Sequence, residues 1–134
     1  MKLNQVDKDL IHMAAEIVRA NNDIYSNLEM HVACVLKAKS GKIYKGVNIK
    51  TSHSVCAEQV AIGQALACGE REFDTIVAVK LDENGNPRVC SPCGLCRYIF
   101  NKFKINAKVI VEDSEKNEVL KVWSKDLLPF PYIR

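Results

Sequence analysis

The sequence has no apolar run approaching the roughly 20 residues that a membrane-spanning helix needs. Its first residues lack the apolar segment of a secretory signal, so we expect a cytoplasmic protein that does not cross a membrane. Repeats, low-complexity tracts and linkers rich in proline, glycine or serine are also missing, which predicts one domain over residues 1–134. The net charge of +3 is too small to indicate nucleic acid binding.

What the chain does have is an ordinary globular composition and an unusual number of cysteines. Its 134 residues are 48% hydrophobic and 26% charged, which is enough apolar material for a real core. A chain of this size does not need disulfides for stability, and a cytoplasmic protein keeps its thiols reduced. We therefore expect free thiols, some of which carry chemistry. The six cysteines are Cys34, Cys56, Cys68, Cys90, Cys93 and Cys96.

Hydrophobic periodicity predicts an α/β fold. Apolar residues at helical spacing indicate helices over 7–20, with Asp7 as the N-cap, and over 56–68 and 93–103. Apolar and β-branched runs predict strands over 31–38, 42–48, 75–81, 107–111 and 119–123. We expect a turn at 82–87 and an apolar tail, 127–132, packed against the domain. This order predicts a mixed sheet in which the first two strands form an antiparallel hairpin, strands separated by helices are joined by parallel crossovers, and helices lie on the faces.

Two fragments carry residues with metal chemistry. Cys56-Ala57-Glu58 begins one predicted helix, and Cys93 and Cys96 begin the next. Two neighbouring helices on one sheet would bring these three thiols together. Three sulfurs fill three of the four tetrahedral positions of zinc and leave one open for water, which is typical of a catalytic zinc site. Glu58 is then left to transfer protons.

The electrostatics of helix N-termini support this placement. Their unsatisfied N–H groups and partial positive charge stabilise thiolates, the form that binds metal. Zinc with three thiolates carries a charge of −1, so the site needs a positive neighbour. We expect Arg97, which follows Cys96, to compensate the thiolate charge by donating to a ligand sulfur.

Cys-Ala-Glu followed by Pro-Cys-x-x-Cys resembles the signature of the zinc-dependent cytidine deaminase superfamily. The three-cysteine form is similar to the small homotetrameric cytidine deaminases and to blasticidin S deaminase. The resemblance extends over most of the chain, through Tyr25-Ser26, the segment 41–48, Ser91–Arg97 and Leu127-Leu128-Pro129.

This resemblance implies a fold, a reaction and a set of site residues. The fold is a three-layer α/β/α sandwich with a five-stranded mixed sheet. The reaction is hydrolytic loss of ammonia from a cytosine-type nucleoside, with one Zn²⁺ per chain, in a homotetramer that binds neither nucleic acid nor membrane. Backbone groups of Ala57 and Ser91 would hold the ring, and Asn48 would hold the sugar or its replacement. His53 lies near the expected pocket mouth and is a further candidate contact.

The chain departs from the family pattern at three positions, two of which concern the substrate and one the thiolates. Lys50 stands where cytidine deaminases have a ribose-binding Glu, Leu28 where a Phe stacks on the pyrimidine, and Gln59 where an Arg compensates the thiolates. They favour a modified nucleoside such as blasticidin S, with standard cytidine or deoxycytidine as the alternative. Lys50 is also suited to an acidic group on the substrate.

Other interpretations of the same residues remain open from sequence alone. Cys93 and Cys96 also fit a dithiol redox pair, and adding Cys90 would close a structural four-cysteine zinc site. A zinc-binding or nucleoside-binding relative without catalysis is a third alternative, against which the presence of Glu58 argues. His31 and His53 suit either the pocket or a polar surface. We expect Cys34 and Cys68 to be small core residues.

Overall fold

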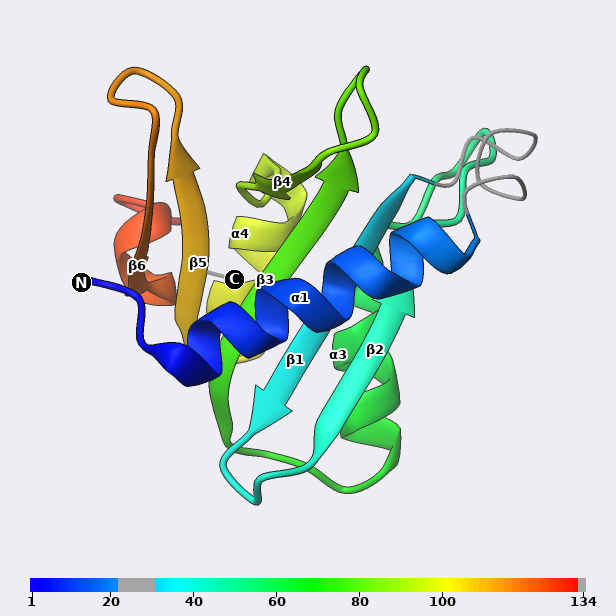
Figure 1. The fold of residues 1–134 in the computed structure, drawn as a ribbon. Helices are drawn as coiled ribbons and strands as arrows, with labels where there is room; N and C mark the ends of the chain where they lie inside the picture. Colours follow the sequence, from blue (N-terminus) through cyan, green and yellow to red (C-terminus); the bar gives the residue numbers. More distant parts are fainter. Residues whose placement is uncertain (22–30, 133–134) are drawn as a thin grey trace.

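The computed structural model describes residues 1–21 and 31–132, and a mixed six-stranded β-sheet forms its middle layer (Figure 1). Five strands follow the order β2-β1-β3-β5-β6, and β4 pairs with β3 beside this path. The strands are β1 (Val32–Ala38), β2 (Ile43–Val47), β3 (Phe73–Leu81), β4 (Pro87–Cys90), β5 (Lys108–Asp113) and β6 (Glu118–Trp123).

Strand directions place the two crossover helices. β1 is antiparallel to both β2 and β3, so β2 and β3 run the same way with β1 between them. β3 and β5 are parallel neighbours, and β5 and β6 form an antiparallel pair. Helix α3 (Ala57–Ala67) connects β2 to β3, and α4 (Gly94–Lys102) lies between β4 and β5. The predicted β1–β2 hairpin and the parallel crossovers are confirmed, and β3–β4 and β5–β6 are further antiparallel pairs.

The helices cover the two faces of the sheet (Figure 1). Helix α1 (Gln5–Ala20) crosses one face, and α3 and α4 lie behind the other. Side chains of β1 alternate accordingly, because neighbouring residues of a strand face opposite sides. Cys34 and Leu36 belong to the core cluster under α3 and α4, whereas Val35 packs with α1. The expected three-layer α/β/α sandwich is therefore confirmed.

Helix α1 begins two residues earlier than predicted, and Asp7 is not its N-cap. Asn4 is the N-cap and forms a capping box with Asp7, in which each side chain accepts from the other's backbone N–H. The Asp7 carboxylate also lies 2.7 Å from the Lys121 ammonium of β6, and both side chains are buried. The terminal amino group of Met1 donates to the Lys121 carbonyl, so the start of the chain is fastened to β6.

Three other features differ from the sequence-based expectations because contacts between distant parts of the chain determine them. The predicted turn includes Pro87 and no strand is predicted over residues 88–90, but Pro87–Cys90 pairs antiparallel with the end of β3. Cys34 is fully buried as predicted, whereas Cys68 is the exposed C-cap of α3 and not a core residue. The chain after the short helix η1 (Ser124–Leu127) is not packed down throughout, since the side chains of Phe130 and Tyr132 are 101% and 67% exposed.

Candidate metal centre

Cys56 and Cys93 occupy the same position in two different helices. Each is the N-cap residue, with extended backbone angles (φ −73°, ψ 152° and φ −70°, ψ 170°), of α3 and α4 respectively. Neither side chain forms a capping hydrogen bond. Cys96 lies in the first turn of α4 and is buried. The two helix starts therefore bring three thiols to one place.

The spacing of the three sulfurs fits a zinc ion. The Sγ atoms of Cys56, Cys93 and Cys96 all lie within 4.8 Å of one another, and those of Cys56 and Cys93 are 3.6 Å apart. Two sulfurs bound to one tetrahedral zinc at about 2.3 Å are separated by roughly 3.8 Å. Among the described residues, this is the one cluster of at least three metal-ligating side chains, and Cys90 is not part of it.

Burial and neighbouring dipoles act on these thiols in opposite directions. Burial raises the pKa of Cys96 far above its ordinary value and also raises that of Cys56. At Cys93, burial again acts to raise the pKa, but the N–H groups of Cys96 and Leu95 and the neighbouring thiols outweigh it, and the net pKa is lowered. The most exposed of the three thiols is thus the one whose thiolate form is favoured without metal.

Glu58 lies beside this cluster in a nearly dry environment. Its residue is 6% exposed, at the second position of α3. Burial raises the pKa of the carboxyl group, while its own backbone N–H and the Cys96 thiol act to lower it. The Glu58 charge in turn adds to the raised pKa of Cys34 and Cys90, whose main cause is burial. A buried carboxyl group with a raised pKa beside the thiols is suited to proton transfer.

A close backbone contact holds the start of α3 in place. A side chain at Gly46 of β2 would meet the Ala57 carbonyl oxygen at 2.5 Å and the Ala61 amide nitrogen at 2.6 Å. Only glycine allows the helix to approach the strand this closely. Gly46 therefore helps to set where Cys56 and Glu58 lie.

The comparisons with known proteins decide the family. A family model described as the cytidine and deoxycytidylate deaminase zinc-binding region matches residues 4–112. The chain belongs to this deaminase family. It is therefore a zinc-dependent hydrolytic deaminase of cytosine-type nucleosides with one zinc ion per chain, and the observed donor set fits that ion.

Individual relatives differ in how much of the deaminase they match. A blasticidin-S deaminase of Bacillus cereus is 34% identical over 139 aligned residues, covering 98% of this chain and 96% of that protein. A cytidine deaminase of Shewanella halifaxensis is 35% identical over 114 residues, covering 81% of this chain, but the match spans only 33% of that longer protein.

Solved structures agree with the fold. The cytidine deaminase from Burkholderia pseudomallei has a TM-score of 0.66 at 28% identity, covering 90% of this chain and 98% of that one. The cytidine deaminase from Bacillus anthracis has a TM-score of 0.73 at 18% identity, covering 96% of this chain and 90% of that one.

The residues predicted to contact the substrate differ in their burial and hydrogen bonds. The Asn48 side-chain oxygen accepts from the backbone N–H groups of His31 and Val32 at 2.9 Å, which fixes its amide plane. Ala57 is buried in the first turn of α3. The Ser91 hydroxyl donates to the Glu112 carbonyl and accepts from its N–H, both at 3.1 Å, which fastens the segment before Cys93 to β5.

Lys50 and His53 lie in a short exposed loop directly before Cys56. Ile49 and Val55 form an isolated β-bridge with two backbone hydrogen bonds of 2.9 Å, which closes this loop at its base. Within it, the Ser54 hydroxyl donates to the Thr51 carbonyl and the His53 N–H donates to the Thr51 hydroxyl. Leu28 and the Tyr25-Ser26 segment lie outside the residues that the structure describes.

The Arg97 side chain donates to backbone carbonyls and not, as expected, to a cysteine sulfur. Its Nε donates to the Pro92 carbonyl at 2.8 Å and its Nη1 to the Leu127 carbonyl at 3.3 Å. Over residues 1–21 and 31–132, no hydrogen bond joins its guanidinium to a cysteine sulfur. The sequence could not reveal this, because Leu127 lies 30 positions downstream.

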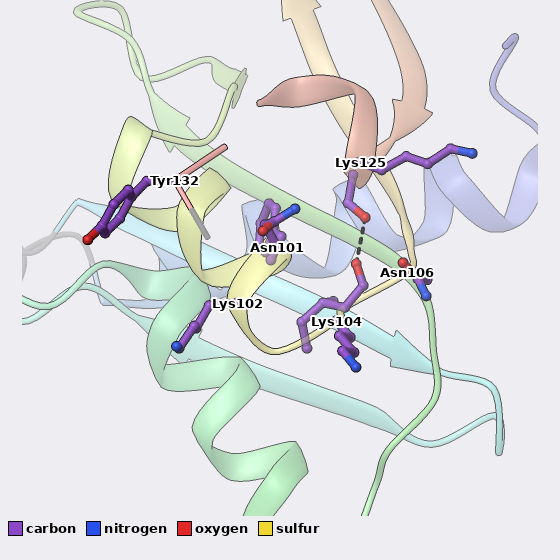
Figure 2. A pocket seen from close by; sticks show the side chains of 9 residues that line it. Asn101, Lys102, Lys104, Asn106, Lys125 and Tyr132 are labelled. Carbon is purple, nitrogen blue, oxygen red and sulfur yellow. Dashed lines mark hydrogen bonds between the residues drawn. The ribbon is translucent and has the colours of Figure 1, made fainter. Parts of the chain in front are cut away.

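A separate pocket lies at the other end of α4 (Figure 2). It has a volume of about 390 Å³ and includes Lys102, Lys104, Lys125 and Tyr132 in its lining. It contains neither the cysteine cluster nor Glu58, which lie by the N-terminal end of α4. The side chains of Lys102 and Lys125 extend in different directions (Figure 2), so these two ammonium groups do not converge on a common ligand position.

Proposed function

We propose that this deaminase acts on a modified cytosine nucleoside, with blasticidin S as the first candidate, and converts it to the uracil form with release of ammonia. The observation that carries the proposal is the end-to-end match to a blasticidin-S deaminase, which covers 98% of this chain and 96% of that protein. Lys50 supports it, because a cation replaces the ribose-binding carboxylate expected of a standard cytidine deaminase.

The proposed mechanism assigns a role to each residue of the centre. Cys56, Cys93 and Cys96 hold the zinc ion as thiolates. When bound, zinc supplies the Lewis acidity that activates a water molecule for attack on C4 of the pyrimidine. Glu58 accepts a proton from that water and delivers it to N3 of the ring as the oxygen adds to C4. It then accepts the proton of the hydroxyl group added at C4 and delivers it to the amine, which leaves as ammonia while the C4 carbonyl forms. Its burial keeps the carboxyl group away from competing bulk water.

Substrate positioning is assigned to backbone groups and to the exposed loop. Backbone groups of Ala57 and Ser91 contact the ring, and Asn48 contacts the sugar or its replacement. The bonds from His31 and Val32 to Asn48 support this role, since a fixed amide is a pre-organised partner. Lys50 and His53, which lie in the closed loop before Cys56, contact the substrate outside the ring. Leu28 is proposed to lie against the ring in place of the stacking Phe.

The test is a panel of aminopyrimidine nucleosides: blasticidin S, cytidine and deoxycytidine, each followed by loss of substrate absorbance. The zinc content of the same preparation is measured first. We expect one zinc per chain and the highest kcat/KM on blasticidin S. Turnover of none of the three by a zinc-loaded enzyme would contradict the proposal. Metal-free protein with a Cys93–Cys96 disulfide would instead support a dithiol oxidoreductase.

The second candidate is a standard cytidine or deoxycytidine deaminase. It is favoured by the Burkholderia pseudomallei cytidine deaminase structure, which aligns with 90% of this chain at 28% identity. The same panel separates the two, because this candidate predicts a higher kcat/KM on cytidine or deoxycytidine than on blasticidin S.

Lys50 gives the substrate proposal its own test. A cation in this loop favours a substrate that carries a carboxylate or phosphate. Lys50→Glu reverses that charge, so it should lower kcat/KM on acidic cytosine nucleosides more than on neutral ones. Lys45→Glu, an exposed lysine of β2, is the matched control. An unchanged ratio of acidic to neutral substrates in Lys50→Glu would remove this role.

We also propose a cytoplasmic homotetramer. The cytoplasmic location is supported by the six free cysteines. Within the described chain, the helices are all too short or too polar to cross a membrane. Assembly is supported by large apolar side chains that lie open to solvent in the single chain, among them Leu95, Phe103, Trp123 and Phe130.

A further inference from the structure

The Arg97 guanidinium donates to two backbone carbonyls near the cysteine cluster. Arg97 follows Cys96, and its Nε donates to the carbonyl of Pro92, the residue before Cys93, at 2.8 Å. The backbone N–H of Arg97 donates to the Cys93 carbonyl at 3.0 Å. The segment 92–97 is therefore closed on itself by two hydrogen bonds of one residue.

This closure acts at a helix start whose N-cap side chain forms no capping hydrogen bond. A capping side chain normally satisfies an N–H group at a helix start and contributes about 1 kcal/mol. The N-cap of α4 is Cys93, whose side chain makes no such bond and whose sulfur points to the cluster. The bond from Arg97 to the Pro92 carbonyl satisfies no N–H group of the helix, but it ties the residue before Cys93 to the first turn of α4.

The second hydrogen bond of the guanidinium extends the connection to the end of η1. Arg97 Nη1 donates to the carbonyl of Leu127, the last residue of η1, at 3.3 Å. The side chain is half-buried between α4 and η1. The guanidinium thus holds the turn with Cys93 and Cys96 and also the end of η1. Residues 128–132, which follow η1, are called the C-terminal segment below.

We propose that Arg97 is a positioning residue that fixes the turn with Cys93 and Cys96 for zinc and couples the C-terminal segment to that turn. This rests on the proposed assignment of the two cysteines as ligands. Groups that hold metal ligands in place typically change metal affinity or activity by about 10- to 100-fold when removed. The coupling is reciprocal, so a fixed turn also orders the segment after η1.

Geometry separates this role from charge compensation. Two carbonyls in different segments require the fork of a guanidinium, which a lysine ammonium does not reproduce. A role based on charge alone would survive Arg97→Lys and would weaken with added salt. A positioning role is lost in Arg97→Lys and does not depend on salt.

The experiment compares Arg97→Ala and Arg97→Lys with Arg71→Ala as the matched control. Arg71 also donates to two backbone carbonyls, those of Leu66 and Glu70 at 3.0 and 2.7 Å, but near the far end of α3. Zinc affinity is measured by competition with a chromogenic chelator at low and high salt. Limited proteolysis of the C-terminal segment is measured on the same zinc-loaded samples.

We expect both Arg97 variants to bind zinc about 10- to 100-fold more weakly at either salt concentration, and their C-terminal segments to be cut faster. Arg71→Ala should match the wild type in both measurements. Wild-type zinc affinity in Arg97→Lys would overturn the proposal in favour of charge alone. An equal loss in Arg71→Ala would overturn it in favour of general destabilisation.

The zinc content of the wild type distinguishes failure of this proposal from failure of the proposed function. If the wild type binds no zinc, the ligand assignment itself fails, and this is seen before any variant is compared. If Arg97→Ala does not fold, as judged by circular dichroism, the comparison of Arg97→Lys with Arg71→Ala carries the test. Weaker zinc binding with unchanged proteolysis would overturn the coupling to the C-terminal segment.

Discussion

Glu58 combines two opposing influences on one carboxyl group. Its position in the first turn of α3 favours the negative form, because helix N-termini carry partial positive charge. Its burial disfavours that form more strongly, and the net pKa is raised. A carboxyl group balanced in this way can accept a proton in one step and release it in the next.

Replacing Glu58 with Gln should remove proton transfer while preserving shape. We expect Glu58→Gln to keep its zinc and to lower kcat by about 10²- to 10⁴-fold, the usual contribution of general acid–base catalysis. Metal content and steady-state kinetics check both halves of the prediction. Glu72→Gln, at an exposed position before β3, should turn over like the wild type. A kcat within tenfold of wild type in zinc-loaded Glu58→Gln would contradict the assigned role.

Tyr44 should make stability fall at high pH. Its hydroxyl donates to the Glu70 carboxylate at 2.9 Å, and burial together with this neighbour raises its pKa from 10.0 to about 12. The folded pKa lies above the unfolded one, so the contribution is complete below pH 10 and is lost between pH 10 and about 12. Urea unfolding at pH 9 and pH 11 should show a steeper loss in wild type than in Tyr44→Phe. Parallel losses would contradict this linkage.

For single residues, the sequence predicts features that depend on near neighbours in the chain. Cys56, Glu58, Cys93 and Cys96 could be picked out because short spacing and helix-start chemistry place them. The contacts of Arg97 could not, since its partners are backbone carbonyls that any residue supplies. Side-chain type likewise does not distinguish the buried Cys34 from the exposed Cys68.

At the scale of elements, the contact between β2 and α3 determines where the centre forms. The α3 backbone lies directly on Gly46, so the helix start, with Cys56 as its N-cap, is held against the strand. Helices and strands were predictable from periodicity, with ends shifted by one or two residues. β4 was not, because four residues beginning with proline carry no strand pattern and pair only once the end of β3 is present.

Gly46→Ala should push α3 away from β2. The added Cβ would lie within 3.0 Å of Ala57 and Ala61 backbone atoms, which cannot move independently of the helix. We expect a loss of about 1–3 kcal/mol in unfolding free energy, as for overpacking, together with weaker zinc binding. Chemical denaturation and chelator competition measure the two effects.

The matched control for this substitution is on the helix itself. Gly63→Ala, in the middle of α3, meets no atom within 4 Å, so it should stabilise the protein by about 0.5–1 kcal/mol. Equal effects of the two substitutions would show that Gly46 contributes only backbone flexibility and does not position α3.

At the scale of the whole molecule, sheet topology explains why residues 37 positions apart meet. β2 and β3 run in the same direction, so the chain segments that leave them emerge at the same end of the sheet. Helix α3 begins after β2, and α4 begins after the short return of β4 from β3. Sites collect at such ends in sheets of this kind. The expected fold contained this juxtaposition, but not the route through β4.

The last prediction concerns assembly, since the single chain leaves large apolar side chains in water. Phe103, at the end of α4, is 57% exposed and Phe130, after η1, is 101% exposed. Light scattering after gel filtration should give the wild type four times the 15.0 kDa mass of one chain. The double variant Phe103→Ser/Phe130→Ser should have a lower mass and an unchanged circular dichroism spectrum, because exposed side chains contribute little to a single chain's stability. A wild-type mass of one chain at working concentration would contradict the proposed tetramer, and an unchanged tetramer in the double variant would place its interfaces elsewhere on the molecule.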